Sequence, residues 1–289
     1  MSDPEPTIRV AVDPTNPGQF FACCGLLELA DRLWPGAEGW FADRQFCIAR
    51  GGSLGELLQQ LSAATVSSSL TGAELKRLGT LQSLDKRKRT PEIAAEMADL
   101  RTRWRLERLH LSEPLDLWLD WWRDETGERT DLKTWAAKVQ VLGMVRDFHG
   151  LIKTLPWDAS ALTECLTQSV RADVLPFYFD SDAGAQGSAL DAGFSAYDLR
   201  TVMKGHSLRR PLIELGSFIA FQRFRPRPVE GTDRYRFSTW MTPTPVCVAG
   251  VLGAAVVEVP DVQCYEFRLF SRTQYMKTFL PATPLGGSR

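Results

Sequence analysis

The sequence has little that would suit a membrane or secreted protein. No stretch contains the roughly 18–20 uninterrupted apolar residues that a transmembrane helix needs. Residues 1–6 are acidic and proline-rich, without the basic start and apolar run of a signal peptide. The six cysteines form no C-x-x-C pair, and their apolar neighbours favour reduced, buried thiols. We therefore expect a cytoplasmic protein that makes no contact with a membrane.

Signatures of catalysis and of nucleotide binding are also missing. The three histidines, His110, His149 and His206, are far apart in sequence, and none has the spacing of a metal ligand. Walker-type and G-x-G-x-x-G patterns are absent. Cys23 and Cys24 lie in an apolar segment, where thiols pack rather than react. The sequence thus predicts no catalytic residue, no metal and no cofactor.

Two sets of carboxylates resemble metal sites only in part. Asp180 begins a run like the opening of a calcium loop, but Gly184 and Ala185 stand at its fifth and sixth places, where the loop needs an oxygen ligand and a glycine. Asp116 and Asp120 share one face of a predicted strand with their stems roughly 13 Å apart, too far to share one metal. The run that begins at Asp180 is predicted to be a polar surface loop, and Asp116 and Asp120 are predicted to be solvated carboxylates.

A buried helix near the N-terminus is the clearest structural feature of the sequence. Asn16 can cap a helix, Pro17 suits its first position, and Gln19 could complete a capping box. Residues 20–34 are apolar on nearly all faces, which is typical of a buried helix. Gly25, in the middle of this segment, indicates close packing against another element.

The remaining pattern predicts an α+β fold that mixes helices with short antiparallel strands. Strands are expected at residues 8–12, 40–41, 45–49, 115–122, 235–240 and 265–270. Further helices are expected at 53–64, within 73–108 with a break near Thr90, at 132–153 and at 210–224. Residues 180–193 are expected to form a loop, and the type of 249–259 stays open. A change of character between residues 155 and 176 favours an N-terminal region 1–155 with a basic helical segment and a C-terminal region 156–289 with an Arg-rich segment; a single domain is also compatible.

Positive charge is clustered, although the net charge of the chain is only −1. The first cluster is Lys86, Arg87, Lys88 and Arg89, followed by four more arginines between residues 101 and 108 with Trp104 among them. Residues 200–236 hold nine Lys or Arg against three acids. Those nine cations are Arg200, Lys204, Arg209, Arg210, Arg223, Arg225, Arg227, Arg234 and Arg236.

Aromatic residues are interleaved with the second cluster, which is the pattern of a nucleic-acid groove. These residues are Phe221, Phe224, Tyr235 and Phe237. The arginine fork donates two parallel hydrogen bonds to a phosphate. We predict that nucleic acid is bound by Lys86, Arg87, Lys88, Arg89, Arg200, Lys204, Arg209, Arg210, Arg223, Arg225 and Arg227. The alternative is a solvated charged face balanced by acids elsewhere in the fold.

Four segments between residues 13 and 240 are distinctive as strings: DPTNPGQFFACCGLLELADRLW, LDWWRDETGERTDLKTWAAKVQ, RRPLIELGSFIAFQRFRP and RYRFSTW. They resemble the compact large-subunit proteins of type I CRISPR surveillance complexes of subtype I-U, whose main branch is called I-G. At Ala137 the family pattern often has glycine, a difference that touches no functional group.

The resemblance implies a non-catalytic subunit of an antiviral, RNA-guided complex. Its partners would be the other subunits, the crRNA, target double-stranded DNA and a helicase-nuclease. Such subunits commonly recognise the protospacer-adjacent motif and help to open the duplex. Two alternatives stay open. One is a crRNA-processing ribonuclease, for which His206 and Lys204 are the candidate residues. The other is an architectural subunit that makes no DNA contact.

Overall fold

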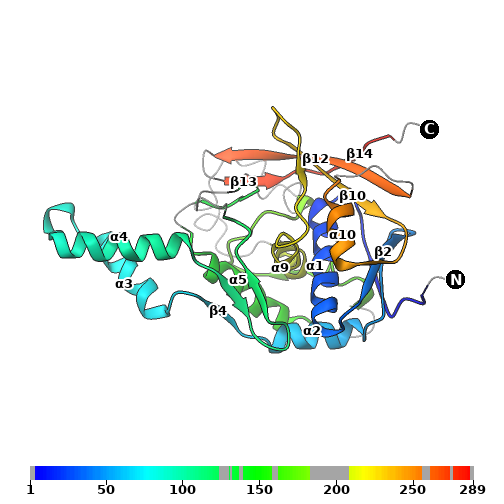
Figure 1. Cartoon of the computed structure of the whole chain (residues 1–289), viewed down its shortest axis with the longest axis horizontal. Helices are drawn as coiled ribbons and strands as arrows, with labels where there is room; N and C mark the ends of the chain where they lie inside the picture. The colour runs from blue at the N-terminus through cyan, green and yellow to red at the C-terminus, as the bar shows by residue number, and fades with distance from the viewer. Residues whose placement is uncertain are drawn as a thin grey trace.

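The chain combines a helical centre, small antiparallel sheets and a projecting pair of helices. The computed structural model describes residues 4–123, 130, 132–136, 139–157, 162–182, 208–255, 261–273 and 276–286. Helices α1 and α9 lie at the centre, whereas α3 and α4 extend away from the body, on the left of Figure 1. All strand pairs in the described residues are antiparallel. The predicted α+β class, with a buried N-terminal helix, is confirmed.

Helix α1 (Pro17–Leu33) begins where the sequence predicts. The Asn16 side chain accepts hydrogen bonds from the backbone N–H groups of Gly18 and Gln19, and Pro17 occupies the first turn. Gln19 does not close a capping box, because its side-chain oxygen accepts from the N–H of Asp13 at 2.8 Å instead. Every residue of α1 from its first position to Ala30 is buried, so the helix has no solvent face along most of its length.

The partner of α1 is helix α9 (Pro211–Ala220), all of whose residues are buried. The two backbones meet at Gly25 and Gly216, where a Cβ added to Gly25 would lie 2.1 Å from the Gly216 carbonyl oxygen. Ser217 Oγ donates a hydrogen bond to the Gly18 carbonyl at 2.9 Å across the same contact. The expected role of Gly25 in close packing is therefore confirmed.

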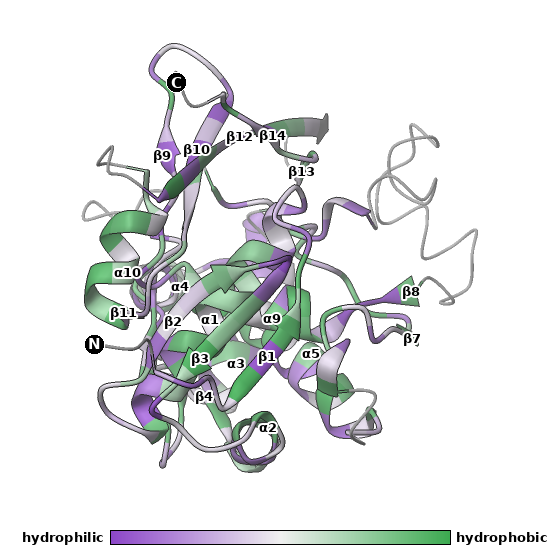
Figure 2. Cartoon of the chain, turned by 90° about the vertical axis from the view of Figure 1, so that its right-hand side faces the viewer, coloured by the Kyte–Doolittle hydropathy of each residue, from purple (hydrophilic) through white to green (hydrophobic). Residues whose placement is uncertain are grey.

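Two sheets cover this helical pair with an aromatic core between them. The first has the order β1 (Ile8–Ala11), β3 (Gln45–Ala49), β2 (Glu38–Ala42) and β11 (Thr244–Pro245). The second runs β13 (Met276–Phe279), β12 (Val262–Thr273), β10 (Arg234–Trp240) and β9 (Arg227–Pro228), with β14 (Thr283–Pro284) also paired to β12. Figure 2 shows the first sheet lying over α1, whose ribbon is largely hydrophobic. Phe20 links the layers, because its ring stacks on Phe41 of β2 and on Phe237 of β10.

A third sheet, a two-stranded pair and three further helices complete the described part of the body. The sheet has the order β4 (Val66–Ser68), β5 (Leu109–Leu111) and β6 (Leu117–Leu119), and β7 (Val170–Arg171) pairs with β8 (Leu208–Arg209). Helix α2 (Leu54–Ala63) has a capping box between Ser53 and Glu56. The other helices of the body are α5 (Val141–Thr154) and α10 (Val246–Gly253). The open segment at 249–259 is thus helical at its start, and its residues 256–260 lie outside the described residues.

The helical arm consists of α3 (Gly72–Ser83), a 3-10 turn (Lys86–Lys88) and α4 (Pro91–Arg105). It has a small core of its own, formed by Leu78, Leu81, Met97 and Leu100. Trp104 packs against both this small core and the main one. The main core is one continuous cluster with residues from both predicted regions, 1–155 and 156–289.

Two predicted elements are shorter than the sequence indicates. The helix expected at 132–153 begins only at Val141, because the Thr134 carbonyl accepts a hydrogen bond from the N–H of Lys277 and its hydroxyl donates to the Phe177 carbonyl. The strand expected at 115–122 is reduced to β6. Its predicted alternation holds up to Trp121, but Trp122 is buried rather than exposed. The part of the expected 180–193 loop beyond residue 182 lies outside the described residues.

The six cysteines are all free, but two of them are not buried. Cys23, Cys24, Cys47 and Cys165 are buried, whereas Cys264 on β12 is half-buried and Cys247 on α10 is exposed. Burial raises the pKa of the Cys23 and Cys24 thiols well above the ordinary value, which suits packing rather than nucleophilic chemistry. No helix in the described part of the chain is long and apolar enough to cross a membrane.

The Gly25–Gly216 contact generates a stability prediction. Gly25→Ala adds a Cβ that must displace the Gly216 backbone, so we expect the free energy of unfolding to fall by about 1–3 kcal/mol or more. Gly150→Ala is the matched control, because a Cβ there meets nothing within 4 Å and the residue lies in exposed helix. It should stabilise the protein by about 0.5–1 kcal/mol. Urea unfolding measures both, and equal stability of the two variants would show that the central contact is loose.

Candidate nucleic-acid interface

The helical arm carries the first basic cluster at its free end. The 12 and 15 residues of α3 and α4 correspond to lengths of roughly 18 and 22 Å. Thr71 and Glu74 form a capping box that starts α3, and Thr90 caps α4 with Pro91 in its first turn. The turn between the helices therefore lies at the tip of the arm, far from the body (Figure 1). Lys86, Arg87 and Lys88 are exposed there.

Arg89 has a different role from the other three members of its cluster. Its guanidinium donates hydrogen bonds to the carbonyl oxygens of Leu84, at 2.9 and 3.2 Å, and of Gln82 at 3.2 Å. These carbonyl groups lie at the C-terminal end of α3, where no backbone N–H of the helix is available to bond to them. Arg89 therefore closes the turn, and its binding of phosphate stays a prediction that competes with this structural role.

Ion pairs on the arm engage several of its acids. Arg77 of α3 binds both carboxylate oxygens of Glu96 on α4, at 2.8 and 2.7 Å. Arg103 of α4 returns to Glu74 of α3 at 2.5 Å. Hydrogen bonds from the Thr71 amide and hydroxyl, together with Arg103, lower the pKa of Glu74 to about 2, so it stays ionised at neutral pH. These ion pairs hold the two helices against each other. The charges that form them neutralise one another and so add nothing to the net charge of the arm.

A net positive charge remains after these pairs. Residues 72–105 contain nine Lys or Arg and five acids, a net charge of +4 on a chain whose total is −1. The exposed cations of the arm that form no ion pair with any residue that the structure describes are Lys76, Lys86, Arg87, Lys88, Arg101 and Arg105. Arg101 and Arg105 are four residues apart and share one face of α4. The arm is thus a concentrated cationic surface on a nearly neutral protein.

Most of the second basic cluster is engaged by acids or carbonyls of the fold. Arg223 binds the buried carboxylate of Glu28 at 2.5 Å. Arg225 donates to the Phe221 carbonyl at 3.3 Å. Arg234 and Arg236 both pair with Glu266, at 2.8 and 3.0 Å. Exposed Arg227 on β9 has no ion pair within the described ranges, whereas Arg200, Lys204 and His206 lie outside them. Nucleic-acid contacts of this cluster stay a prediction.

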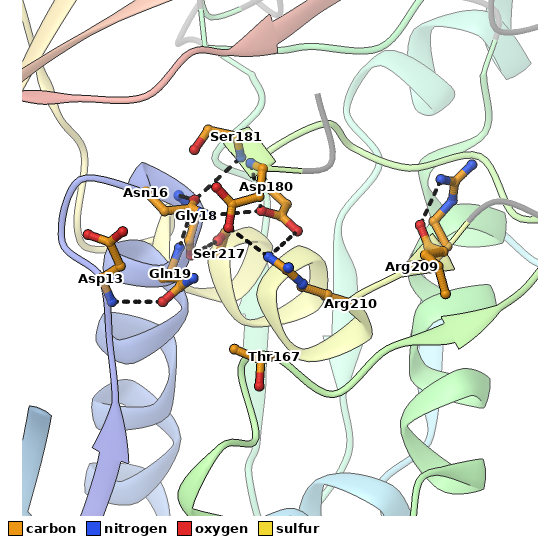
Figure 3. A network of polar contacts seen from close by, with 12 residues as sticks. Asp13, Asn16, Gly18, Gln19, Thr167, Asp180, Ser181, Arg209, Arg210 and Ser217 are labelled. Atoms are coloured by element: carbon orange, nitrogen blue, oxygen red, sulfur yellow. Dashed lines mark hydrogen bonds and ion pairs between the residues drawn. The ribbon is translucent and has the colours of Figure 1, made fainter. Parts of the chain in front are cut away.

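Arg209 and Arg210 precede α9, and Arg223 and Arg225 follow it, so the expected placement at opposite helix ends is confirmed. Arg210 joins a polar network where the starts of α1 and α9 meet (Figure 3). Its Nη1 lies 2.9 Å from Asp182 and 3.4 Å from Asp180. Arg209 points away and donates to the Val174 carbonyl at 3.2 Å. Both arginines therefore already hold the segment before α9 in place.

Asp180 and Glu214 are the buried acids of this region. The Asp180 carboxylate accepts from Asn16 Nδ2 at 2.8 Å, so it ties the α1 cap to the Arg210 network. Glu214 Oε2 accepts from the N–H of Phe177 at 2.8 Å. Burial, and then the charge of Asp180, raise the pKa of Glu214 to about 8, against the lowering effect of Arg209 and of backbone amides. Asp180 is buried among these partners, so it is a structural acid and not part of the polar surface loop that the sequence predicts.

The aromatic residues interleaved with the second cluster do not face solvent. Phe221, Phe224, Tyr235 and Phe237 are all buried in the main core. Trp104 on the arm is half-buried between the two cores. The interpretation of these rings as stacking partners for bases is therefore wrong. They fill the hydrophobic core, whereas the basic side chains beside them in sequence point away from it.

Sequence reasoning missed an exposed aromatic pair on the sheet β4–β5–β6. The ring of Trp118 stacks on that of His110, with centroids 4.4 Å apart and planes inclined by 21°. The alternation of residues 115–121 already places Trp118 on the outer face, which is the signal that could have identified it. Asp116 and Asp120, on the same face, are paired with His110 at 2.8 Å and with Arg108 at 2.9 Å.

The remaining histidine in the described residues, His149, is a core residue. Its Nε2 lies 2.8 Å from the Leu61 carbonyl oxygen, and burial lowers its pKa. Among the described residues, no group of three or more His, Cys, Asp or Glu could hold a metal ion. His206 and Lys204, the candidate pair for the ribonuclease alternative, lie outside those residues.

Glu214 generates a pH prediction. Its pKa is raised from an ordinary value of 4.5 to about 8, so the folded protein binds a proton that the unfolded chain releases between these values. The free energy of unfolding should then fall with rising pH between about 4.5 and 8, by at most ~1.4 kcal/mol per pH unit. Glu214→Gln removes the titration and should flatten this slope. Urea unfolding at several pH values measures it; identical slopes in both proteins would contradict a protonated Glu214.

No known protein-family model matches the chain, and no curated protein has a significantly similar sequence.

Proposed function

We propose that this protein is a non-catalytic, large-subunit-like component of a type I CRISPR surveillance complex and that its helical arm binds the phosphate backbone of nucleic acid. Its partners in this proposal are the crRNA, target double-stranded DNA, the other subunits and the helicase-nuclease. It would act in the cytoplasm and contribute to recognition of the protospacer-adjacent motif.

One observation carries the binding part of this proposal. The arm projects from the body, has a net charge of +4, and presents Lys86, Arg87 and Lys88 at its tip without an acidic partner among the described residues. Cations that no acid neutralises release counterions when they contact phosphate, and that release is the main source of sequence-independent affinity. A solvated charged face would be expected to pair its cations with acids, as Arg234 and Arg236 do with Glu266.

The resemblance of four sequence segments supports the assignment to a CRISPR complex. Two of the segments correspond to α1 and α9, whose mutual packing organises the core. The basic arm lies outside the resembling segments, so the two lines of support are independent. An architectural subunit that makes no DNA contact would not explain the uncompensated positive charge at the tip of the arm. Cleavage of repeat RNA by the isolated protein without metal would favour the ribonuclease alternative.

Salt-dependent DNA binding tests the proposal. The variant Lys86→Ala, Arg87→Ala, Lys88→Ala leaves Arg89 in its structural role. We expect it to weaken binding to duplexes of any sequence and to flatten the plot of log affinity against log salt by about 0.9 per lost contact. Fluorescence anisotropy with a labelled duplex at several salt concentrations measures both quantities.

A charge-matched control separates the arm from net charge alone. The side chains of three other arginines are 58–59% exposed, but each is paired with an acid. They are Arg50, Arg234 and Arg268. Replacing these three by Ala changes the net charge equally and should largely preserve the wild-type slope. If both triple variants behave alike, the arm has no special role; if neither affects binding, the architectural alternative replaces this proposal.

A further inference from the structure

The exposed Trp118–His110 pair is built into the outer face of the sheet next to the arm. Trp118 lies in the middle of β6, directly opposite His110 of β5, and is 48% exposed. The leucines that flank these two residues, at positions 109, 111, 117 and 119, are fully buried beneath the sheet. A large aromatic ring is thus held at the surface by a rigid layer underneath.

His110 is itself fixed, so the orientation of the stack is set in advance. Its Nε2 lies 2.8 Å from Asp116 Oδ1, and the backbone carbonyl of Asp116 accepts a hydrogen bond from Arg32 at 3.0 Å. His110 supports one part of the indole, while the exposed part of Trp118 remains open to solvent. A pre-oriented aromatic surface loses little conformational entropy when a planar ligand stacks on it.

The chain connects this pair directly to the cationic arm. Helix α4 ends at Arg105, and β5 begins four residues later. Arg108 lies between them, has a side chain that is 62% exposed, and pairs with Asp120 on the same sheet face as Trp118. The arm cations are therefore followed along the chain by an arginine and then by an exposed aromatic ring.

We propose that Trp118, supported by His110, stacks on an unpaired base of single-stranded nucleic acid whose phosphates contact the arm. This inference rests on the proposed function and specifies its ligand. A base in a duplex has both faces covered by its neighbours, so only an unpaired base offers a face to Trp118. Basic tracks combined with aromatic platforms are the usual means of binding single strands. The aromatic part of that footprint is thus on β5 and β6, not among the rings of residues 221–237.

The test compares single-stranded and duplex ligands with the full-length protein. Anisotropy is measured with labelled DNA and RNA oligonucleotides of about 20 nucleotides, longer than one such site, and with the corresponding DNA duplex. Trp118→Leu keeps apolar bulk but removes the π face, so single-strand affinity should fall about 5-fold or more, with duplex affinity unchanged. Trp118→Phe retains a ring and should restore most of the affinity. Phe270→Leu is the matched control, since Phe270 on β12 is 40% exposed and should have no effect.

The outcomes separate this inference from the proposal on which it rests. If the wild-type protein binds duplex with the expected salt slope but Trp118→Leu binds single strands as tightly as wild type, the platform is overturned and the arm stands. The same holds if Trp118→Phe fails to restore affinity or if Trp118→Leu weakens duplex binding equally. If the tip variant Lys86→Ala, Arg87→Ala, Lys88→Ala has no effect on either ligand, the arm itself is overturned. Equal losses on DNA and RNA indicate recognition of the base alone, and a loss on one of them assigns that polymer as the ligand.

Discussion

The structure depends on the close contact between α1 and α9 at Gly25 and Gly216. The two helices are buried along almost their whole shared length, so neither has a solvent face that could absorb a shift. Interiors are packed at crystal-like density, and a backbone-to-backbone approach leaves no room for a side chain. Phe20 of α1 stacks on Phe41 of β2 and on Phe237 of β10, so both sheets pack against the helix that this contact holds in place.

Buried polar groups complete this arrangement at the end of the helix pair. Asn16 caps α1 and also donates to Asp180, which in turn lies within reach of Arg210 at the start of α9. Each group therefore satisfies a partner that burial would otherwise leave unpaired, which is the condition for tolerating charge inside a core. The buried Glu28 of α1 is likewise paired, with Arg223, which follows the end of α9. Arg210 and Arg223 of the second basic cluster thus contribute to the folded state, whereas the tip cations Lys86, Arg87 and Lys88 are exposed.

The sequence predicts those features that depend on local chemistry. The Asn16 cap, the buried helix with Gly25, the capping box at Ser53 and the break at Thr90 all follow from neighbouring residues and are present. Long-range partners decide the rest. Thr134 bonds to Lys277 of β13 and to Phe177 instead of continuing a helix, and Arg223 pairs with Glu28 at a sequence separation of 195. A count of arginines cannot distinguish paired from unpaired cations, and the presence of aromatic residues between them does not show whether those rings are buried.

The separate core of the arm affects how the sequence of this protein can evolve. Leu78, Leu81, Met97 and Leu100 stabilise α3 and α4 locally, and the exposed residues around them contribute nothing to the main core. Local units of this kind open and close with their own free energy. Substitutions on the outer faces of the arm therefore alter its charge and reach without weakening the centre of the molecule. Natural selection can adjust the charge of the arm while the α1–α9 pair stays constant, so sequence divergence should concentrate on the arm.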